Sequence, residues 1–329
     1  MTRVLVTGAG AVLGQGIINA LRRSSLEVEI AAADPNPLSP GLFWVERGYI
    51  IPMASDPGYL TRFEEVLAAE RPDAVLVGTD VELPILAKHR AALEERHGTR
   101  ILVSSPGVVR IADDKWETFR FCRDAGLDPP LSALPEDEAM LRALVEHCGF
   151  PLVVKPRVGA RSMGVSLVRD EGELRAALAG RTGLVVQQVA GQPDCEFTAS
   201  ALVFDGEAKA SIVMRRDLRD GNTHRAYAEP YPELNDFVRR AAEALQPYGP
   251  ANFQFRTDAE GRPHIFEINA RFSGATPLRA LVGFNEVEMC LRHLLFGEVV
   301  SQPAELKQGV VLRHLSETFV TTAELGELR

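Results

Sequence analysis

Apolar runs and helical patterns alternate along the first third of the chain. Helical spacing of apolar positions follows Gly16 and returns over residues 58–70 and 83–97. The intervening runs are typical of short buried strands, at residues 3–8, 28–34, 74–77 and 100–103. Strands that alternate with helices predict an open parallel sheet. We expect this α/β unit to occupy residues 1–112.

The pattern changes after residue 112, where short strands and helices predict an α+β arrangement. Residues 113–126 are typical of a capped helix closed by a glycine, and Pro129-Pro130 ends any helix there. Further helices are expected at 136–148, 171–179 and 232–246, and strands at 151–156, 165–168 and 184–189. Two apolar runs flank Asp205-Gly206, which favours a hairpin.

Residues 251–271 hold two alternating runs around a polar turn at Gly261. A hairpin symmetric about residues 260/261 gives four cross-strand pairs: Asn252 with Asn269, Phe253 with Ile268, Gln254 with Glu267, and Phe255 with Phe266. Because side chains alternate between faces, the four apolar residues are expected on one face. The other face collects polar residues: Asn252, Gln254, Glu267, Asn269 and Arg271.

The polar face of this hairpin has the chemistry of a magnesium site. Glu267 and Asn269 point the same way on one strand, and Gln254 lies opposite Glu267. Three oxygen ligands with one carboxylate suit Mg²⁺, with phosphate or water completing the shell. The alternative is a half-buried hairpin with a solvated polar face. Uncharged amides weaken that alternative, because exposed strands more often carry Thr, Lys or Glu.

Composition narrows the class of protein. The chain has 329 residues, a net charge of −9, 46% apolar and 25% charged residues, as in a globular protein of two or three units. Its apolar runs are shorter than the ~20 residues of a membrane helix. Four scattered cysteines favour a reducing cytoplasm. The acidic charge disfavours nucleic acid as a partner, so we expect a cytoplasmic protein that binds neither nucleic acid nor membranes.

Several polar residues follow one another in a characteristic order. Lys115 opens a helix, Lys155 lies near a strand end before a glycine-bounded loop, and Glu196 follows another strand. Glu267-x-Asn269-x-Arg271 comes last. This order resembles the ATP-grasp superfamily, and is most similar to the synthetase halves of the carbamoyl-phosphate synthetase large subunit and to the pyrrolysine-pathway ligase. The likeness covers residues 113 to about 300, and residues 1–112 resemble the domain that precedes ATP-grasp in those enzymes.

The resemblance implies how a nucleotide is held. Lysines at the positions of Lys115 and Lys155 contact ATP phosphates in the family, since ammonium groups suit multi-oxygen anions. The loop 159–164 resembles the flexible flap, and Glu196 resembles the carboxylate that binds ribose hydroxyls. The hinge that meets adenine has glutamine here where the family usually has glutamate. The implied ATP-binding residues are Lys115, Lys155, Gly159, Met163, Gly164, Gln187, Gln188, Val189 and Glu196.

The resemblance also implies a metal and catalytic groups. Gln254, Glu267 and Asn269 correspond to the Mg²⁺ ligands, with Mn²⁺ as an alternative ion and with an amide where the first ligand is often acidic. Arg271 corresponds to the arginine that stabilises the transferring phosphoryl group, and acts with Lys155 as a catalytic residue. His224 and Arg225 fall where the family often places a loop near the γ-phosphate.

The first glycine loop admits more than one interpretation. Gly8-x-Gly10-x-x-x-Gly14 lies between a strand and a helix, and Asp34 ends the next strand. This arrangement fits an NAD-dependent sugar-nucleotide enzyme, but no tyrosine has a lysine four residues later. The loop alternatively borders the acceptor substrate, or serves as a packing turn. Asp80, just past a strand, either contacts substrate or caps a helix.

These observations predict an ATP-dependent ligase that joins a carboxylate to an amine or ammonia. The reaction would pass through an acyl phosphate and release ADP and phosphate. Residues 113–329 would form the ATP-grasp domain, with a lid lobe at about 129–189 that excludes water and a larger lobe at 190–329. A homodimer is expected by analogy. An ATP-binding phosphotransferase, an accessory subunit and the NAD-dependent enzyme stay open as alternatives.

Overall fold

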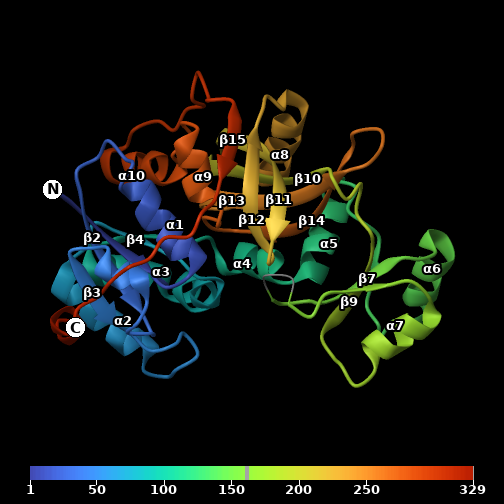
Figure 1. Cartoon of the computed structure of the whole chain (residues 1–329), viewed down its shortest axis with the longest axis horizontal. Coiled ribbons are helices and arrows are strands. Elements are labelled where there is room, and N and C mark those ends of the chain that lie inside the picture. Colours follow the sequence, from blue (N-terminus) through green and yellow to red (C-terminus); the bar gives the residue numbers. More distant parts are fainter. Residues whose placement is uncertain (160–162, 329) are drawn as a thin grey trace.

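Three sheets organise the computed structural model, which describes residues 1–159 and 163–328 (Figure 1). The first sheet is parallel, with strand order β3-β2-β1-β4-β5, which confirms the predicted α/β unit. Its strands are β1 (Thr2–Thr7), β2 (Val28–Asp34), β3 (Arg47–Ile50), β4 (Ala74–Leu76) and β5 (Arg100–Leu102). The sequence analysis missed β3, because Arg47-Gly-Tyr-Ile50 lacks an apolar run.

Helices and single turns of 3-10 helix connect these strands. They are α1 (Val12–Leu21), η1 (Pro40–Phe43), α2 (Tyr59–Glu70), η2 (Asp80–Glu82) and α3 (Leu83–His97). Two further helices, α4 (Pro106–Asp113) and α5 (Lys115–Asp124), lead out of the unit. Ser105 and Asp114 cap these two helices by accepting backbone N–H bonds. The predicted boundary at residue 112 thus falls at the end of α4.

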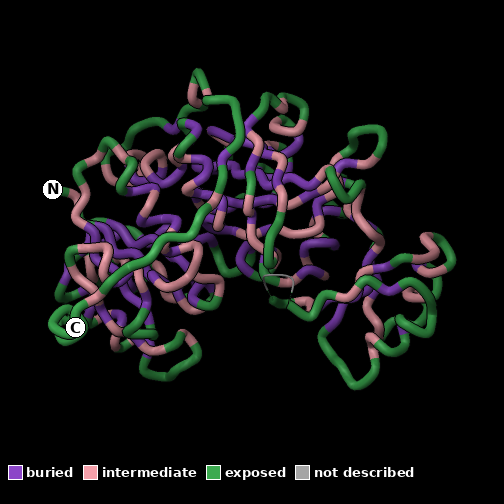
Figure 2. The backbone as a smooth tube through the Cα atoms, viewed as in Figure 1, coloured by how far each residue is buried: buried purple, intermediate pink, exposed green. Residues whose placement is uncertain are grey.

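A small four-stranded sheet follows, with strand order β6-β9-β7-β8. Its elements are β6 (Ser132–Ala133), α6 (Glu138–Cys148), β7 (Leu152–Pro156), β8 (Ser166–Val168), α7 (Glu171–Leu178) and β9 (Leu184–Gln188). We call residues 132–188 the small unit. Leu152, Val154 and Val186 belong to a hydrophobic core that is separate from the others, and in Figure 2 the buried segments of this unit stand apart.

The third sheet is antiparallel and has six strands in the order β14-β13-β10-β11-β12-β15. The strands are β10 (Glu196–Phe204), β11 (Glu207–Arg219), β12 (Asn222–Ala228), β13 (Gly249–Thr257), β14 (Pro263–Asn269) and β15 (Gly309–Leu312). Its helices are α8 (Pro232–Leu245), α9 (Thr276–Leu281) and α10 (Glu286–Phe296), and a last short helix, α11 (Thr322–Gly326), lies near the C-terminal end of the chain. We call it the large sheet. The predicted hairpin at Asp205-Gly206 joins β10 to β11.

The large sheet lies between two helical layers. Phe197, Ala199 and Val213 face a core shared with α4, α5 and α8. Leu202 and Ile212 face a core shared with α1, α9 and α10, so the N-terminal unit packs directly on this sheet. The C-terminal segment runs back beside the N-terminal unit (Figure 1), where the indole N–H of Trp44 donates to Thr318 Oγ1 at 2.8 Å. Among the described residues, no helix combines the length and apolarity that crossing a membrane requires.

Candidate functional site

Polar side chains replace the apolar ones on one face of the large sheet, near the start of β10. Glu196 lies opposite Arg256 on β13, and Arg216 on β11 reaches Glu196 from the other side. The next cross-strand row runs from Thr198 through Gln254 to Glu267, and the row after it from Ser200 through Asn252 to Asn269. The antiparallel register therefore gathers residues that are far apart in the sequence.

The hairpin of β13 and β14 follows the predicted register only in part. Asn252 pairs with Asn269, Phe253 with Ile268, and Gln254 with Glu267, as predicted. An irregularity after Gln254 then shifts the register, so that Phe255 lies opposite Ile265. The predicted pair of Phe255 and Phe266 is wrong, because the symmetric turn assumed no bulge. Ile265 enters the core instead, and the Phe266 ring lies 5.8 Å from Lys155 Nζ.

The three predicted metal ligands meet in one cluster. Glu267 Oε1 accepts hydrogen bonds from Gln254 Nε2 at 3.0 Å and from Asn269 Nδ2 at 3.1 Å. No described residue donates to the second carboxylate oxygen of Glu267. The described residues contain no group of three or more His, Cys, Asp or Glu side chains suited to a metal. One carboxylate with two amides fits a weakly held Mg²⁺ that also needs ligand oxygens.

Lys155 brings a cation from the small unit to this cluster. The side chain, on β7, is buried, and its Nζ donates to Gln187 Oε1 at 2.7 Å and to the Phe266 carbonyl at 3.4 Å. Burial lowers the pKa of Lys155 to about 8, against the opposing effect of the Glu267 carboxylate. The ammonium is therefore still charged near neutral pH. Because it is poorly solvated, an anionic ligand that approaches it displaces little water.

Lys115 lies at the joint between α5 and the small unit. Its Nζ donates to the Gly159 carbonyl at 2.8 Å, and Arg157 forms a two-point ion pair with Asp114, with Nη2 2.5 Å from Oδ2. Gly159 and Gly164 both have positive φ, as a tight turn requires. Met163 is exposed. Residues 160–162 of the predicted flap lie outside the described residues.

The glutamine side chains of the predicted hinge form hydrogen bonds within the protein. Gln187 accepts from Lys155 and donates to Ser132 Oγ at 2.8 Å. Gln188 Oε1 accepts from the Leu131 amide at 3.2 Å. Both side-chain amides thus already have partners, and Val189, just beyond β9, is half-buried. The adenine contacts assigned to these residues stay a prediction.

Arg271 connects the large sheet to the N-terminal unit. Its Nε and Nη2 donate to the two carboxylate oxygens of Asp80 at 2.7 and 2.9 Å. Nη2 also donates to Asn269 Oδ1 at 2.9 Å, and Nη1 to the Phe272 carbonyl at 3.0 Å. Asp80 follows β4 at the carboxyl edge of the parallel sheet, where ligands bind in α/β folds. The arrangement places the N-terminal unit at the candidate site.

A buried carboxylate supports the segment that carries Asp80. Glu82 accepts hydrogen bonds from the hydroxyls of Thr7, Tyr59 and Thr79, at 2.6 to 2.7 Å. Burial raises the pKa of Glu82 and also that of the Tyr59 hydroxyl. Three hydroxyl donors fix the turn at η2, and this anchoring gives Asp80 a defined position.

Residues within the N-terminal unit pack against the first glycine loop and form hydrogen bonds with it. Gly8 has a φ of 61°, and a Cβ there would lie 2.3 Å from Thr79 Cγ2. Asp34 accepts from the Gly10 amide at 2.7 Å and from Ser39 Oγ at 2.6 Å. In a dinucleotide site the acid at this position binds a ribose, whereas here its oxygens serve the turn. This favours the packing interpretation over the NAD interpretation.

Two predicted substrate residues, His224 and Arg225, make their contacts within the large sheet. Arg225 on β12 pairs with Asp217 at 3.6 Å, and Asp217 is the sequence neighbour of Arg216, so it points to the opposite face of β11. The His224 carbonyl accepts from the Arg313 amide at 3.0 Å. Among the described residues, neither side chain forms a hydrogen bond or ion pair with the metal-ligand cluster, and their substrate roles stay predictions.

Sequence reasoning missed three arginines. Arg216 and Arg256 hold Glu196, and the fully buried Arg279 donates to Asn252 Oδ1 at 2.6 Å and pairs with Glu286 at 3.2 Å. Arginine is frequent throughout the chain, so its presence alone carried no signal. The alternation that places Arg216 on the same face as Met214 could have singled it out.

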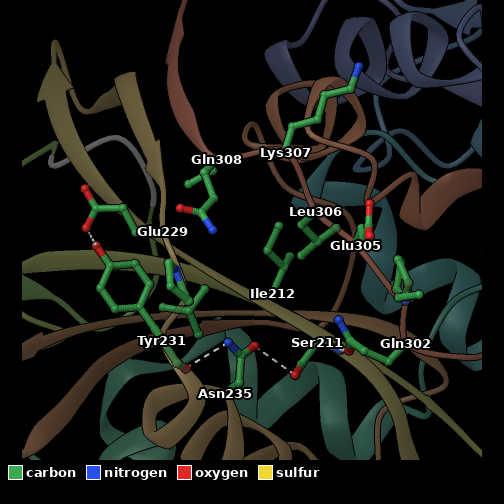
Figure 3. A pocket seen from close by; sticks show the side chains of 15 residues that line it. Ser211, Ile212, Glu229, Tyr231, Asn235, Gln302, Glu305, Leu306, Lys307 and Gln308 are labelled. Atoms are coloured by element: carbon green, nitrogen blue, oxygen red, sulfur yellow. Dashed lines mark hydrogen bonds between the residues drawn. The ribbon is translucent and has the colours of Figure 1, made fainter.

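A separate cavity lies on another part of the large sheet. A cavity of about 470 Å³ lies between β11, the start of α8 and residues 302–308 (Figure 3). Two pairs of its polar side chains are hydrogen-bonded: Tyr231 donates to Glu229 at 2.7 Å, and Ser211 to Asn235 at 2.9 Å. Ser211 belongs to the face of β11 opposite Arg216. This cavity holds no converging set of reactive groups and no predicted site residue.

Comparison with known families agrees with this architecture. Residues 4–102 match the PylC-like N-terminal domain, residues 112–229 the RimK-like ATP-grasp domain, and residues 181–318 the ATP-grasp family found in the biosynthetic pathway with the Ter operon. The two ATP-grasp matches overlap over residues 181–229 and together span the small unit and the large sheet. The resemblance to the ATP-grasp superfamily that the sequence predicted is thus confirmed by two ATP-grasp family models.

Individual relatives are similar over part of their length. The formate-dependent phosphoribosylglycinamide formyltransferase of Rhodococcus jostii is 32% identical over 177 residues, covering 54% of this chain and 41% of that protein. The carbamoyl phosphate synthase large chain of Thermus thermophilus is 26% identical over 305 residues, covering 84% of this chain and 28% of that protein. The chain spans less than half the length of these relatives.

Solved structures share the fold. The ADP complex of purK, an N5-carboxyaminoimidazole ribonucleotide synthetase, superposes with a TM-score of 0.73 at 16% identity, covering 94% of this chain and 81% of that one. This likeness extends over all three sheets. The predicted combination of a parallel N-terminal sheet with a two-lobed ATP-grasp arrangement is confirmed as a fold class.

Proposed function

We propose that the protein is an ATP-dependent ligase that joins a carboxylate to an amine or ammonia through an acyl phosphate. One observation carries the proposal: Lys155 donates to the carbonyl of Phe266, the residue before Glu267, and Glu267, Asn269 and Arg271 are joined by hydrogen bonds. The Glu267 carboxylate also acts electrostatically on Lys155. Two cations and a magnesium-type ligand set are what phosphoryl transfer requires, since it depends mainly on positioning and charge stabilisation.

The chemistry is assigned to the residues as follows. A carboxylate oxygen of the substrate attacks the γ-phosphorus of ATP, the bond to the β-phosphate oxygen breaks, and ADP leaves. Glu267 and Asn269, with Gln254 after its amide turns, would hold Mg²⁺, which neutralises charge on the β- and γ-phosphate oxygens. Lys155 and Arg271 stabilise the charge that develops on the transferring group.

The second half-reaction forms the amide. The amine nitrogen attacks the acyl carbon, phosphate leaves with the bonding electrons, and the amine loses a proton to water. The acyl phosphate must be kept from hydrolysis, and the small unit, predicted as a lid over about 129–189, would close over it. The proposal includes a domain boundary at residue 112, closure of the lid over the site, and assembly of the protein as a homodimer.

Hydroxylamine trapping tests the proposal without knowledge of the natural amine. Purified protein, MgATP and hydroxylamine would be incubated with a panel of amino acids, small peptides and sugar acids. A hydroxamate formed together with ADP supports acyl-phosphate chemistry and identifies the class of acid. A stable phosphorylated product without hydroxamate contradicts the ligase and favours a phosphotransferase. Stabilisation by NAD but not by MgATP in a thermal shift would contradict both.

A further inference from the structure

The row of Arg216, Glu196 and Arg256 carries an unbalanced charge. Arg216 Nε and Nη2 donate to Glu196 Oε1 at 3.1 and 2.7 Å, and Arg256 Nε donates to Oε2 at 2.9 Å. The side chains of Arg216 and Glu196 are only 7% and 8% exposed. The Arg256 side chain is 28% exposed. Two guanidinium groups therefore share one carboxylate, and one of the two, that of Arg216, is nearly buried with it. Burying a charge without a partner is costly. A bound anion would offset the positive charge that Glu196 leaves uncompensated.

Arg216 also bridges two predicted parts of the nucleotide site. Its Nη2 donates to Gln254 Oε1 at 2.6 Å, and Gln254 in turn donates to Glu267. Glu196 is the predicted ribose ligand, and Glu267 is a predicted metal ligand. In any adenine nucleotide the phosphates lie between the ribose and the oxygens that bind the metal. The guanidinium of Arg216 thus lies along the path of the phosphates.

Counting donors shows that Arg216 has capacity for a ligand. A guanidinium has five N–H groups, and the contacts to Glu196 and Gln254 use those on Nε and Nη2. No described residue accepts a hydrogen bond from Nη1. Arg256 differs, because its contacts are with Glu196 and not with Gln254. The two arginines share a carboxylate, but only one of them reaches toward the metal ligands.

We propose that Arg216 is a further nucleotide-binding residue, which binds a phosphate between the ribose and metal-binding ends of the site. The planar guanidinium suits phosphate oxygens. When a phosphate engages Arg216, Gln254 Oε1 is released and its amide turns toward the metal. This inference rests on the proposed function, since it takes the ribose and metal roles of Glu196 and Glu267 as given.

Titration calorimetry with adenosine and ADP separates a phosphate role from a purely structural one. The proteins are the wild type, Arg216→Gln and the matched control Arg256→Gln, all in Mg²⁺ buffer. Arg216→Gln loses two hydrogen bonds to Glu196, so adenosine affinity should fall as it does in Arg256→Gln. We expect ADP affinity to fall about tenfold further, the scale of a lost charge-assisted hydrogen bond. Arg256→Gln, which touches only Glu196, should weaken both ligands by the same factor.

The outcomes are distinguishable. Equal losses of adenosine and ADP affinity in Arg216→Gln would overturn the proposal, because Arg216 would then act only by holding Glu196. A wild type that binds neither ligand would overturn the proposed function and this inference with it. If Arg216→Gln does not fold, Arg216→Lys replaces it. A retained point charge without the planar fork should give a smaller excess loss for ADP over adenosine, and equal losses for the two ligands would contradict a phosphate contact.

Discussion

The large sheet and the small unit contribute to the site in different ways. The large sheet holds its polar side chains in hydrogen-bonded networks, as Arg271 shows with hydrogen bonds to Asp80, Asn269 and the Phe272 carbonyl. The small unit has a core of its own and reaches the sheet through single side chains such as Lys155. The large sheet forms the floor of the site, and the small unit adds a cation from a unit with a separate core.

Removing the cation of the small unit should have the largest effect. We expect Lys155→Ala to reduce ADP formation by about 10³-fold, because a preorganised charge beside the transferring group is lost from a water-poor site. The circular dichroism spectrum should not change. Lys209→Ala is the matched control, since Lys209 pairs with Glu207 near the β10–β11 hairpin. Wild-type turnover by Lys155→Ala would show that the small unit contributes no essential charge.

Removing one partner of a buried ion pair tests how strongly the large sheet, the floor of the site, is stabilised. Arg279 and Glu286 are both fully buried, and Arg279 Nε has no partner among the described residues. Glu286→Gln leaves the guanidinium without its counter-charge, so the free energy of unfolding should fall by about 3 to 4 kcal/mol in urea titrations. Glu288→Gln, on the same helix but in a partly exposed pair with Arg292, should cost less than about 1 kcal/mol. Equal losses would contradict a larger contribution from the buried pair.

The buried lysine should make stability depend on pH. The pKa of Lys155 is about 8 in the folded protein against 10.5 ordinarily. Between these values the unfolded chain binds the additional proton, so the free energy of unfolding should rise with pH through this window, by about 3 kcal/mol in all. Urea titrations at both ends would measure the rise. Lys155→Met should lack this component, and identical slopes for the two proteins would refute the assignment.

A milder change tests the link between the floor and the N-terminal unit. Asp80→Asn keeps one acceptor for Arg271 but removes the charge, so we expect ADP formation to slow about tenfold, equivalent to about 1.4 kcal/mol. Asp124→Asn is the control, because Asp124 is exposed and pairs with Arg123. Steady-state assays of the two variants compare the effects. Similar rates for both would mean that Asp80 does not orient Arg271.

Local periodicity predicted much of the fold and part of the site. Alternation along 251–271 placed Gln254, Glu267 and Asn269 together, because a hairpin with a short turn sets its own register. The same reasoning failed at Phe266, where a bulge shifts the strand. It also missed β3, whose pairing with β2 comes from its place at the sheet edge rather than from an apolar run.

The sequence by itself determined which chemical groups the protein has and how neighbouring ones alternate along each element. It also determined the order of motifs that marks the ATP-grasp superfamily. Only the tertiary structure decided that Asp80 holds Arg271, which lies 191 residues later, and that two arginines share Glu196. These contacts depend on strand order and on packing between units, and neither is encoded in local spacing. For that reason the contacts that hold the floor of the site follow from the assembled sheet and not from the sequence alone.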